Sequence, residues 1–230
     1  MTNIHLVGGE KGGVGKSLVS RVLAQYLIDR NLPFTGFDTD RSHGALMRFY
    51  AEHASPALVN HYEALDRIIE AAVEQPGRRI LVDLAAQTFD PLIKWMDDSG
   101  VVNLADEMDI HLHYWHVMDS GKDSVDLLKR LLDRFGTGLK YVLVRNQVRG
   151  NDFGILEESG EQARAVALGA KVITIKKLYE GVMNKIDNGS SSFAQAKSAE
   201  KDSTGLGLMD RQRVKMWLRD TFREFDDVGV

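Results

Sequence analysis

The chain has 230 residues and no cysteine, and its 29 basic against 33 acidic residues give a formal net charge of −4. The absence of cysteine excludes disulfides, thiolate metal sites and cysteine nucleophiles, and the charge argues against a basic coat over the whole surface. The N-terminal residues turn polar too early for a signal peptide, and no apolar run approaches the roughly 18 residues of a membrane span. We therefore expect a cytoplasmic globular protein with a single domain over 1–230, and membrane binding is not expected.

Short apolar runs alternate with stretches of helical periodicity through most of the chain. Strands are predicted at 4–8, 33–38, 80–83, 110–117, 141–145 and 171–175. Helices are predicted at 17–30, 44–54, 62–74, 91–97, 122–135, 156–168 and 178–186. This alternation predicts an α/β fold, with a mostly parallel sheet covered by helices on both faces.

The C-terminal part departs from that alternation. The segment 188–208 is rich in Ser, Gly and Lys and predicts a long flexible loop. A final helix is predicted at 211–225, and its large apolar residues fall on one face: Val214, Trp217, Leu218, Phe222 and Phe225. The opposite face carries charges of both signs, whereas helices that lie on membranes usually have a cationic surplus. We therefore expect this helix to pack on the core.

A glycine-rich segment, Gly9–Ser17 (GEKGGVGKS), follows the first predicted strand and precedes a helix. The glycines Gly12, Gly13 and Gly15 let successive backbone N–H groups turn inward and form an anion nest, at which the helix N-terminus also points. Lys16 would reach the β- and γ-phosphates of ATP, and the Ser17 hydroxyl would ligate Mg²⁺. With the intervening Val14 and the following Leu18, residues 12–18 form the predicted nucleotide-binding loop of a P-loop NTPase architecture.

A second lysine distinguishes this loop from the general pattern, which would place a glycine where Glu10 stands. The segment Lys11–Ser17 resembles the deviant Walker A motif K-G-G-x-G-K-[ST] of the ParA/MinD family of dimerising ATPases. The resemblance implies a homodimer that forms with ATP, in which Lys11 reaches across to the nucleotide bound by the partner. It also implies that Lys11 and Lys16 both act in catalysis.

Three aspartates follow predicted strands and would complete the site. Asp38 and Asp40 end the second strand, and Asp83 ends the apolar run of a Walker B pattern at 79–83. The carboxyl ends of such strands line the ligand crevice in open α/β sheets. Asp38 and Asp83 are therefore the predicted Mg²⁺ residues beside Ser17. By resemblance to the family, Asp40 would orient or deprotonate the attacking water.

Two segments differ from the family pattern. The family often continues with Pro-Gln-Gly after its D-x-D, where this chain has Arg41-Ser42-His43-Gly44. After the Walker B aspartate the family typically has T-P-P-G, where this chain has Leu84–Thr88 (LAAQT) without a glycine. The second difference affects the expected rate of hydrolysis more than nucleotide binding, although Gln87 could orient water as side-chain amides do in other NTPases.

Asn146 ends the apolar run 140–146, and its amide offers both a donor and an acceptor to the edge of an adenine. ParA/MinD relatives place an adenine-contacting asparagine at a similar strand end. The strand at 172–175 and the helix at 178–186 resemble the base-enclosing segment of that family.

Two further groups are less informative. His111, His113 and His116 cluster in one predicted strand, where His111 and His113 share a face and His116 points to the other. Structural histidines are therefore favoured over a metal site. Basic residues that could touch DNA phosphate are better explained as solvated charges: Arg145, Arg149, Lys176, Lys177, Lys185 and the arginines of the last helix. Non-specific DNA binding after dimerisation is what the ParA resemblance implies.

The leading hypothesis is a Mg-ATP-dependent dimerisation switch with slow ATP hydrolysis, in plasmid partition or conjugal DNA transfer. Residues 11–17 together with 82–88 (VDLAAQT) are similar to plasmid-encoded conjugal-transfer and mobilisation ATPases of the TraL type. This subgroup implies a plasmid-encoded protein partner. Two alternatives use the same loop: a small-molecule kinase or ligase, and a weakly hydrolysing ATP-binding scaffold that recruits a protein partner.

Overall fold

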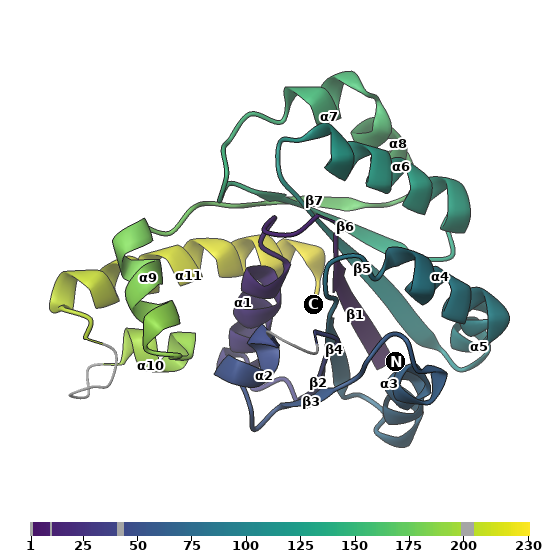
Figure 1. Cartoon of the computed structure of the whole chain (residues 1–230), viewed down its shortest axis with the longest axis horizontal. Helices are drawn as coiled ribbons and strands as arrows, with labels where there is room; N and C mark the ends of the chain where they lie inside the picture. The colour runs from purple at the N-terminus through teal and green to yellow at the C-terminus, as the bar shows by residue number, and fades with distance from the viewer. Residues whose placement is uncertain (1, 10, 41–43, 199–204) are drawn as a thin grey trace.

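The computed structural model describes residues 2–9, 11–40, 44–198 and 205–230. Its centre is a seven-stranded sheet with the order β3-β2-β4-β1-β5-β6-β7, and every pairing is parallel (Figure 1). The strands are β1 (Thr2–Gly8), β2 (Phe34–Asp38), β3 (Ala54–Pro56), β4 (Arg79–Asp83), β5 (Ile110–Met118), β6 (Lys140–Asn146) and β7 (Lys171–Ile175). The predicted α/β class with a parallel sheet is confirmed.

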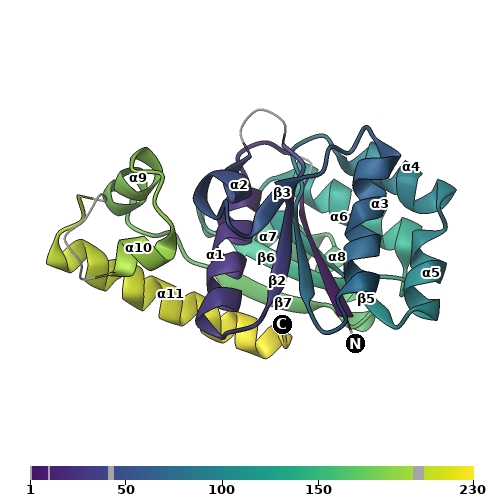
Figure 2. The same cartoon turned by 90° about the horizontal axis from the view of Figure 1, so that it is seen from below.

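The central strands are apolar on both sides because helices cover both faces of the sheet. In β1, Ile4 and Leu6 belong to one buried cluster, whereas Val7 belongs to the other. Figure 2 shows the two helical layers with the sheet between them.

The helices divide between these layers. They are α1 (Lys16–Asp29), α2 (Ala45–Phe49), α3 (Tyr62–Glu74), α4 (Phe89–Asp98), α5 (Val101–Glu107), α6 (Lys122–Phe135), α7 (Gly154–Glu158), α8 (Glu161–Ala167), α9 (Glu180–Asn188), α10 (Phe193–Lys197) and α11 (Leu208–Val228). Buried residues of α3 to α8 pack on one face, and those of α1, α2 and α9 to α11 form the second cluster. Within the described part of the chain, no helix combines the length and apolar character needed to cross a bilayer.

Two predicted helices differ in extent from the observed ones, and one observed helix was not predicted. The helix predicted at 44–54 is shorter, because α2 ends at Phe49 and the chain then forms β3, an edge strand that tolerates Pro56. The helix predicted at 156–168 divides into α7 and α8 at Gly160, whose φ is +76°. A helix at 101–107, α5, was not predicted.

The segment 188–208 was predicted as one long loop but contains α10. Ser192 and Gln195 form a capping box, in which each side chain bonds to the backbone N–H of the other residue. Phe193 is fully buried and lies 5.4 Å from Trp217 of α11, centroid to centroid. Residues 199–204 of that segment lie outside the described part of the chain.

The last helix is longer than predicted at both ends, since α11 spans Leu208–Val228. Its predicted apolar face packs on the core: Val214, Trp217, Leu218 and Phe225 are buried, and Phe222 is partly buried against the same cluster.

The order of the strands places functional side chains along one edge of the sheet. The carboxyl ends of the neighbouring strands β2, β4, β1 and β5 carry, in that order, Asp38, Asp83, the glycine-rich loop and the turn that contains Asp119. The next strand, β6, ends at Asn146. This edge therefore collects most of the predicted site.

Candidate nucleotide-binding site

The glycine-rich loop connects β1 to α1 and depends on two of its glycines. Gly13 and Gly15 have φ values of +78° and +94°, a region that favours glycine. A Cβ on Gly15 would also lie 2.1 Å from the amide nitrogen of Asn146, whereas a Cβ on Gly12 would meet nothing within 4 Å. Gly13 and Gly15 thus carry the turn, and Gly12 is not needed for it.

The two lysines of the loop lie in different surroundings. Lys16, at the start of α1, is only 7% exposed, and its Nζ donates a hydrogen bond to the Lys11 carbonyl at 3.0 Å. This bond closes the loop around the anion nest predicted for the phosphates. Val14 is buried in the core cluster and fixes the loop to the body of the protein. The side chain of Lys11, in contrast, is 37% exposed.

The carboxylates of Asp38 and Asp83 lie on adjacent strands at the same level. The two residues are register partners of β2 and β4, and they are 1% and 3% exposed. The Ser20 hydroxyl of α1 donates to Asp83 Oδ1 at 2.9 Å. Burial and the charge of Asp38 raise the pKa of Asp83 to about 7, although hydrogen bonds from the Ser20 and Ser17 hydroxyls act in the opposite direction.

These groups fit a divalent cation. Burial raises the pKa of both carboxylates, and the charge of Asp38 raises that of Asp83 further. Such a pair is stabilised when a positive charge is shared between the two groups. Hydroxyl and carboxylate oxygens are also the ligands that Mg²⁺ prefers. Ser17, Asp38 and Asp83, the residues predicted for the metal, therefore lie together with suitable chemistry.

Asp38 also accepts hydrogen bonds from the backbone at the start of α2. Its Oδ1 accepts the backbone N–H of Asp40 at 3.0 Å, and its Oδ2 accepts that of Met47 at 3.2 Å, so the carboxylate caps α2. Burial raises the pKa of Asp38, and these backbone hydrogen bonds act against the rise. Asp40 is half-buried at the same sheet edge. The departure from the family pattern at 41–43 lies outside the described residues.

The segment after the Walker B strand is fixed by two threonines. Thr39 Oγ1 accepts the backbone N–H of Ala85 at 2.8 Å, and the Thr88 hydroxyl donates to the Ala85 carbonyl at 2.8 Å. Gln87 adopts φ +59° at the place where the family carries its glycine, and its side chain is exposed. The Ala85 N–H is thus already occupied within the protein.

Asn146 contacts the loop instead of facing open space. Its amide nitrogen donates to the Val14 carbonyl at 2.8 Å, and its Oδ1 is buried without a hydrogen-bond partner. An orphaned acceptor of this kind costs free energy unless another group supplies a donor. The 6-amino group of an adenine is a donor that suits it.

A cavity of about 330 Å³ adjoins the loop. Gly15, Leu18, Val148, Leu178 and Met183 form part of its wall, together with the polar residues Arg21, Lys177, Glu180, Asn184 and Asp187. Leu178 and α9 belong to the segment predicted to enclose the base. The cavity therefore joins the phosphate loop to that segment and has the mixed apolar and polar lining typical of a ligand site.

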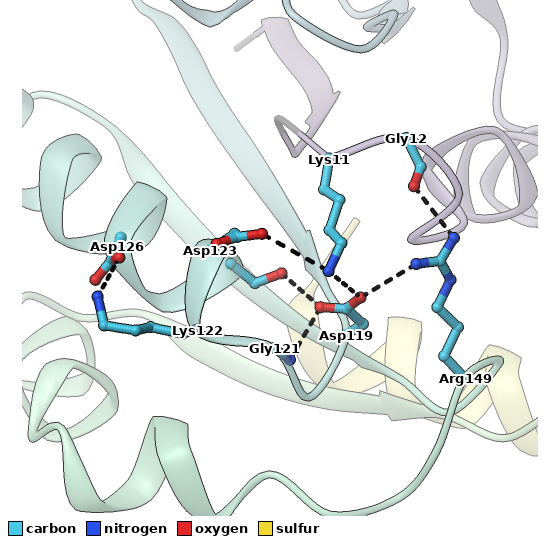
Figure 3. Close-up of polar contacts among 9 residues, drawn as sticks. Lys11, Gly12, Asp119, Gly121, Lys122, Asp123, Asp126 and Arg149 are labelled. Carbon is cyan, nitrogen blue, oxygen red and sulfur yellow. Dashed lines mark hydrogen bonds and ion pairs between the residues drawn. The ribbon is translucent and has the colours of Figure 1, made fainter.

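Two residues that sequence reasoning did not assign to the site contact Lys11 or its loop. Lys11 Nζ lies 3.4 Å from Oδ2 of Asp119, and Arg149, which was considered only as a surface charge, places its Nη1 3.7 Å from the same oxygen (Figure 3). Arg149 Nη2 also donates to the Gly12 carbonyl at 3.3 Å. The position of Asp119 directly after a central strand was the signal that could have identified it.

The three histidines have separate partners. His113 Nε2 lies 3.1 Å from Asn3 Oδ1, and His116 Nε2 donates to the Ser124 carbonyl at 2.7 Å. His111 faces Asp109 at the start of the strand, 4.0 Å away.

Comparisons with known proteins agree with this geometry. The family described as the CobQ/CobB/MinD/ParA nucleotide binding domain, CbiA, matches residues 6–194. Protein TraL of Escherichia coli is 25% identical over 252 aligned positions, which cover 100% of both chains. Protein MobD of Acidithiobacillus ferrooxidans is 25% identical over 200 positions, covering 84% of this chain and 86% of MobD.

A solved structure has the same fold. A nucleotide-binding protein from Archaeoglobus fulgidus, in complex with ADP, superposes with a TM-score of 0.51 at 14% identity, over 79% of this chain and 84% of that one.

The parallel sheet, the glycine-rich loop before α1 and the two strand-end aspartates define a P-loop nucleotide-binding protein. Since the family match covers most of the chain, the protein belongs to the CobQ/CobB/MinD/ParA nucleotide-binding family.

Proposed function

We propose that the protein is a Mg-ATP-dependent dimerisation switch that hydrolyses ATP slowly. The observation that carries this proposal is that the two lysines of the loop differ in burial and in direction. Lys16 is buried within its own loop, whereas Lys11 extends from the loop surface and is partly exposed. A lysine placed in this way would reach a nucleotide held by a second copy of the chain once it leaves the carboxylates that it contacts in its own chain.

The reaction would be phosphoryl transfer from ATP to water, giving ADP and inorganic phosphate. Asp40 would orient the water and accept its proton as the new P–O bond forms and the bond to the β-phosphate oxygen breaks. Lys16 and the loop N–H groups would stabilise the negative charge of the transferred group, and Lys11 would add a positive charge from the partner. Ser17, Asp38 and Asp83 would hold Mg²⁺, which supplies charge neutralisation when bound.

Slow hydrolysis is supported by the segment after Asp83. The family glycine, whose N–H often meets a γ-phosphate, is replaced by Gln87, and the Ala85 N–H of the same segment is bonded to Thr39. Gln87 is the remaining residue of this segment that could hold the attacking water, and it lies on an exposed turn. The same observation favours the second candidate function, a nucleotide-binding scaffold that barely hydrolyses ATP and recruits a protein partner.

A role in plasmid conjugal transfer is supported by the resemblance of residues 11–17 and 82–88 to conjugal-transfer ATPases and by the similarity to TraL and MobD. Plasmid partition is the alternative within the same family. The dimer would act in the cytoplasm, on a plasmid-encoded protein or on non-specific DNA. Gel shifts with random DNA at increasing salt test the second partner, because phosphate contacts weaken steeply with salt.

The molar mass in solution tests the proposal. Light scattering should give a monomer with ADP and a dimer with a non-hydrolysable ATP analogue, together with slow phosphate release from ATP. A dimer without measurable phosphate release would favour the scaffold. A monomer with every nucleotide would contradict the switch and favour a small-molecule kinase or ligase.

A further inference from the structure

The carboxylate of Asp119 is held rigidly in the turn between β5 and α6. Its Oδ1 accepts the backbone N–H of Gly121 and the hydroxyl of Ser124, both at 3.0 Å. The side chain is only 7% exposed. With Oδ1 fixed by two donors, the direction of Oδ2 is fixed as well.

Oδ2 of Asp119 faces the glycine-rich loop and lies near two cationic side chains, one from the loop and one from the segment after β6. Lys11 Nζ lies 3.4 Å away and Arg149 Nη1 lies 3.7 Å away (Figure 3). The exposed carboxylate of Asp123, in the first turn of α6, lies 3.8 Å from the same Lys11 Nζ. Lys11 thus lies between two carboxylates of its own chain.

These contacts are electrostatic and reversible. The Lys11 distances exceed those of good charge-assisted hydrogen bonds, which are about 2.7–2.9 Å. Burial tends to raise the pKa of Asp119, but hydrogen bonds from Gly121 and Ser124 and the charge of Lys11 outweigh it, so the pKa is lowered. Asp119 is therefore ionised at neutral pH and attracts Lys11 without a tight hydrogen bond.

We propose that Asp119 is a positioning residue that holds Lys11 on its own chain and thereby opposes the transfer of Lys11 to the partner's nucleotide. This inference rests on the proposed function. One ammonium group cannot be beside Asp119 and at the nucleotide of a second chain at once, so each protomer must release its contact before the dimer is complete. The contact consequently enters the dimerisation equilibrium twice.

The decisive variant is Asp119→Asn, which removes the charge and retains an oxygen that can accept from Gly121 and Ser124. Partly exposed ion pairs change equilibria by roughly 1.4- to fivefold each, so losing two of them should tighten the dimer by between about two- and 25-fold. Sedimentation velocity with a non-hydrolysable ATP analogue measures the monomer–dimer dissociation constant. Asp119→Glu keeps the charge and should stay closer to the wild type.

Asp126→Asn is the matched control. Asp126 lies on α6 near the same cluster, but it pairs with Lys122, and its side chain is 56% exposed (Figure 3). This variant should leave the dissociation constant unchanged. In the monomer, the side-chain NMR signal of Lys11 should shift in Asp119→Asn and stay in place in Asp126→Asn, which reports the contact separately from dimerisation.

The outcomes separate this inference from the proposed function. A wild type that dimerises with the analogue, beside an Asp119→Asn variant that dimerises equally or more weakly, would overturn the inference alone. An unmoved Lys11 signal in Asp119→Asn would also overturn it. A wild type and a variant that both remain monomeric would contradict the proposed function, and the inference with it.

Discussion

Asp38 and Asp83 are register partners on neighbouring parallel strands, and both carboxylates are nearly excluded from solvent. Two such charges repel each other and are poorly solvated, so their presence destabilises the fold unless a cation joins them. In Asp83 this shows as a pKa raised to about 7, through burial first and the charge of Asp38 second. In the proposed function this pair holds Mg²⁺, and its cost in stability without metal is what the proposal predicts.

Replacing Asp83 tests that explanation. Asp83→Asn should raise the free energy of unfolding at pH 8 by about 1–3 kcal/mol without metal, because it removes a buried charge. It should also abolish the dependence of nucleotide affinity on Mg²⁺, measured by calorimetry with and without EDTA. Asp90→Asn, on the exposed start of α4, is the control. A less stable variant that keeps its Mg²⁺ dependence would contradict a metal role for Asp83.

The glycine-rich loop offers a matched pair of substitutions. Gly15→Ala should lower the free energy of unfolding by about 1–3 kcal/mol, because φ is +94° and the new Cβ would meet the Asn146 amide at 2.1 Å. Gly12→Ala should be close to neutral for stability, since its Cβ meets nothing within 4 Å. Urea denaturation of the two variants measures the difference. Equal losses would show that the close approach of Asn146 does not constrain the loop.

A buried histidine makes stability depend on pH. Burial lowers the pKa of His116 to about 4, against the effect of its hydrogen bond to the Ser124 carbonyl. Below pH 6.5 this residue therefore binds a proton in the unfolded chain but not in the folded one, and its contribution to the free energy of unfolding should fall as the pH decreases from about 6.5 to 4. The slope contributed by one such group reaches about 1.4 kcal/mol per pH unit.

Denaturation of His116→Gln between pH 4.5 and 7.5 measures this contribution. The glutamine amide can still donate to the Ser124 carbonyl, but it does not titrate, so the slope should be shallower than that of the wild type. His61→Gln, which replaces an exposed histidine, should leave the slope unchanged. A slope that is equally steep in His116→Gln would exclude His116 as its source.

The core of the fold was predictable because its signals are local. Strands buried on both faces are continuously apolar, as in β4 and β6. The helical spacing of apolar residues predicted helices at 62–74 and 122–135, and α3 and α6 have these bounds. The phosphate loop was recognisable because its glycines, lysine and serine occur in one short segment. Local signals of this kind need no knowledge of the tertiary structure.

What was not predicted depends on contacts distant in sequence. The helix α10 is short and lies in a segment rich in Ser, Gly and Lys, and it is stabilised by Phe193 packing near Trp217. The role of Asp119 depends on the sheet order, because the pairing of β1 with β5 brings the turn after β5 beside the loop that carries Lys11. Neither proximity follows from the local pattern of residues.

Complementation between two inactive variants tests most directly whether Lys11 acts on the partner's nucleotide. A Lys11→Ala protomer keeps Asp40 for its own nucleotide but supplies no lysine to the partner's nucleotide. An Asp40→Ala protomer supplies Lys11 to its partner but lacks the residue that positions the water at its own nucleotide. A mixed dimer contains one complete site, so phosphate release from an equal mixture should recover to roughly one quarter of the wild-type rate while each variant alone is inactive. A mixture as inactive as its components, or a Lys11→Ala variant with the wild-type rate, would contradict the account.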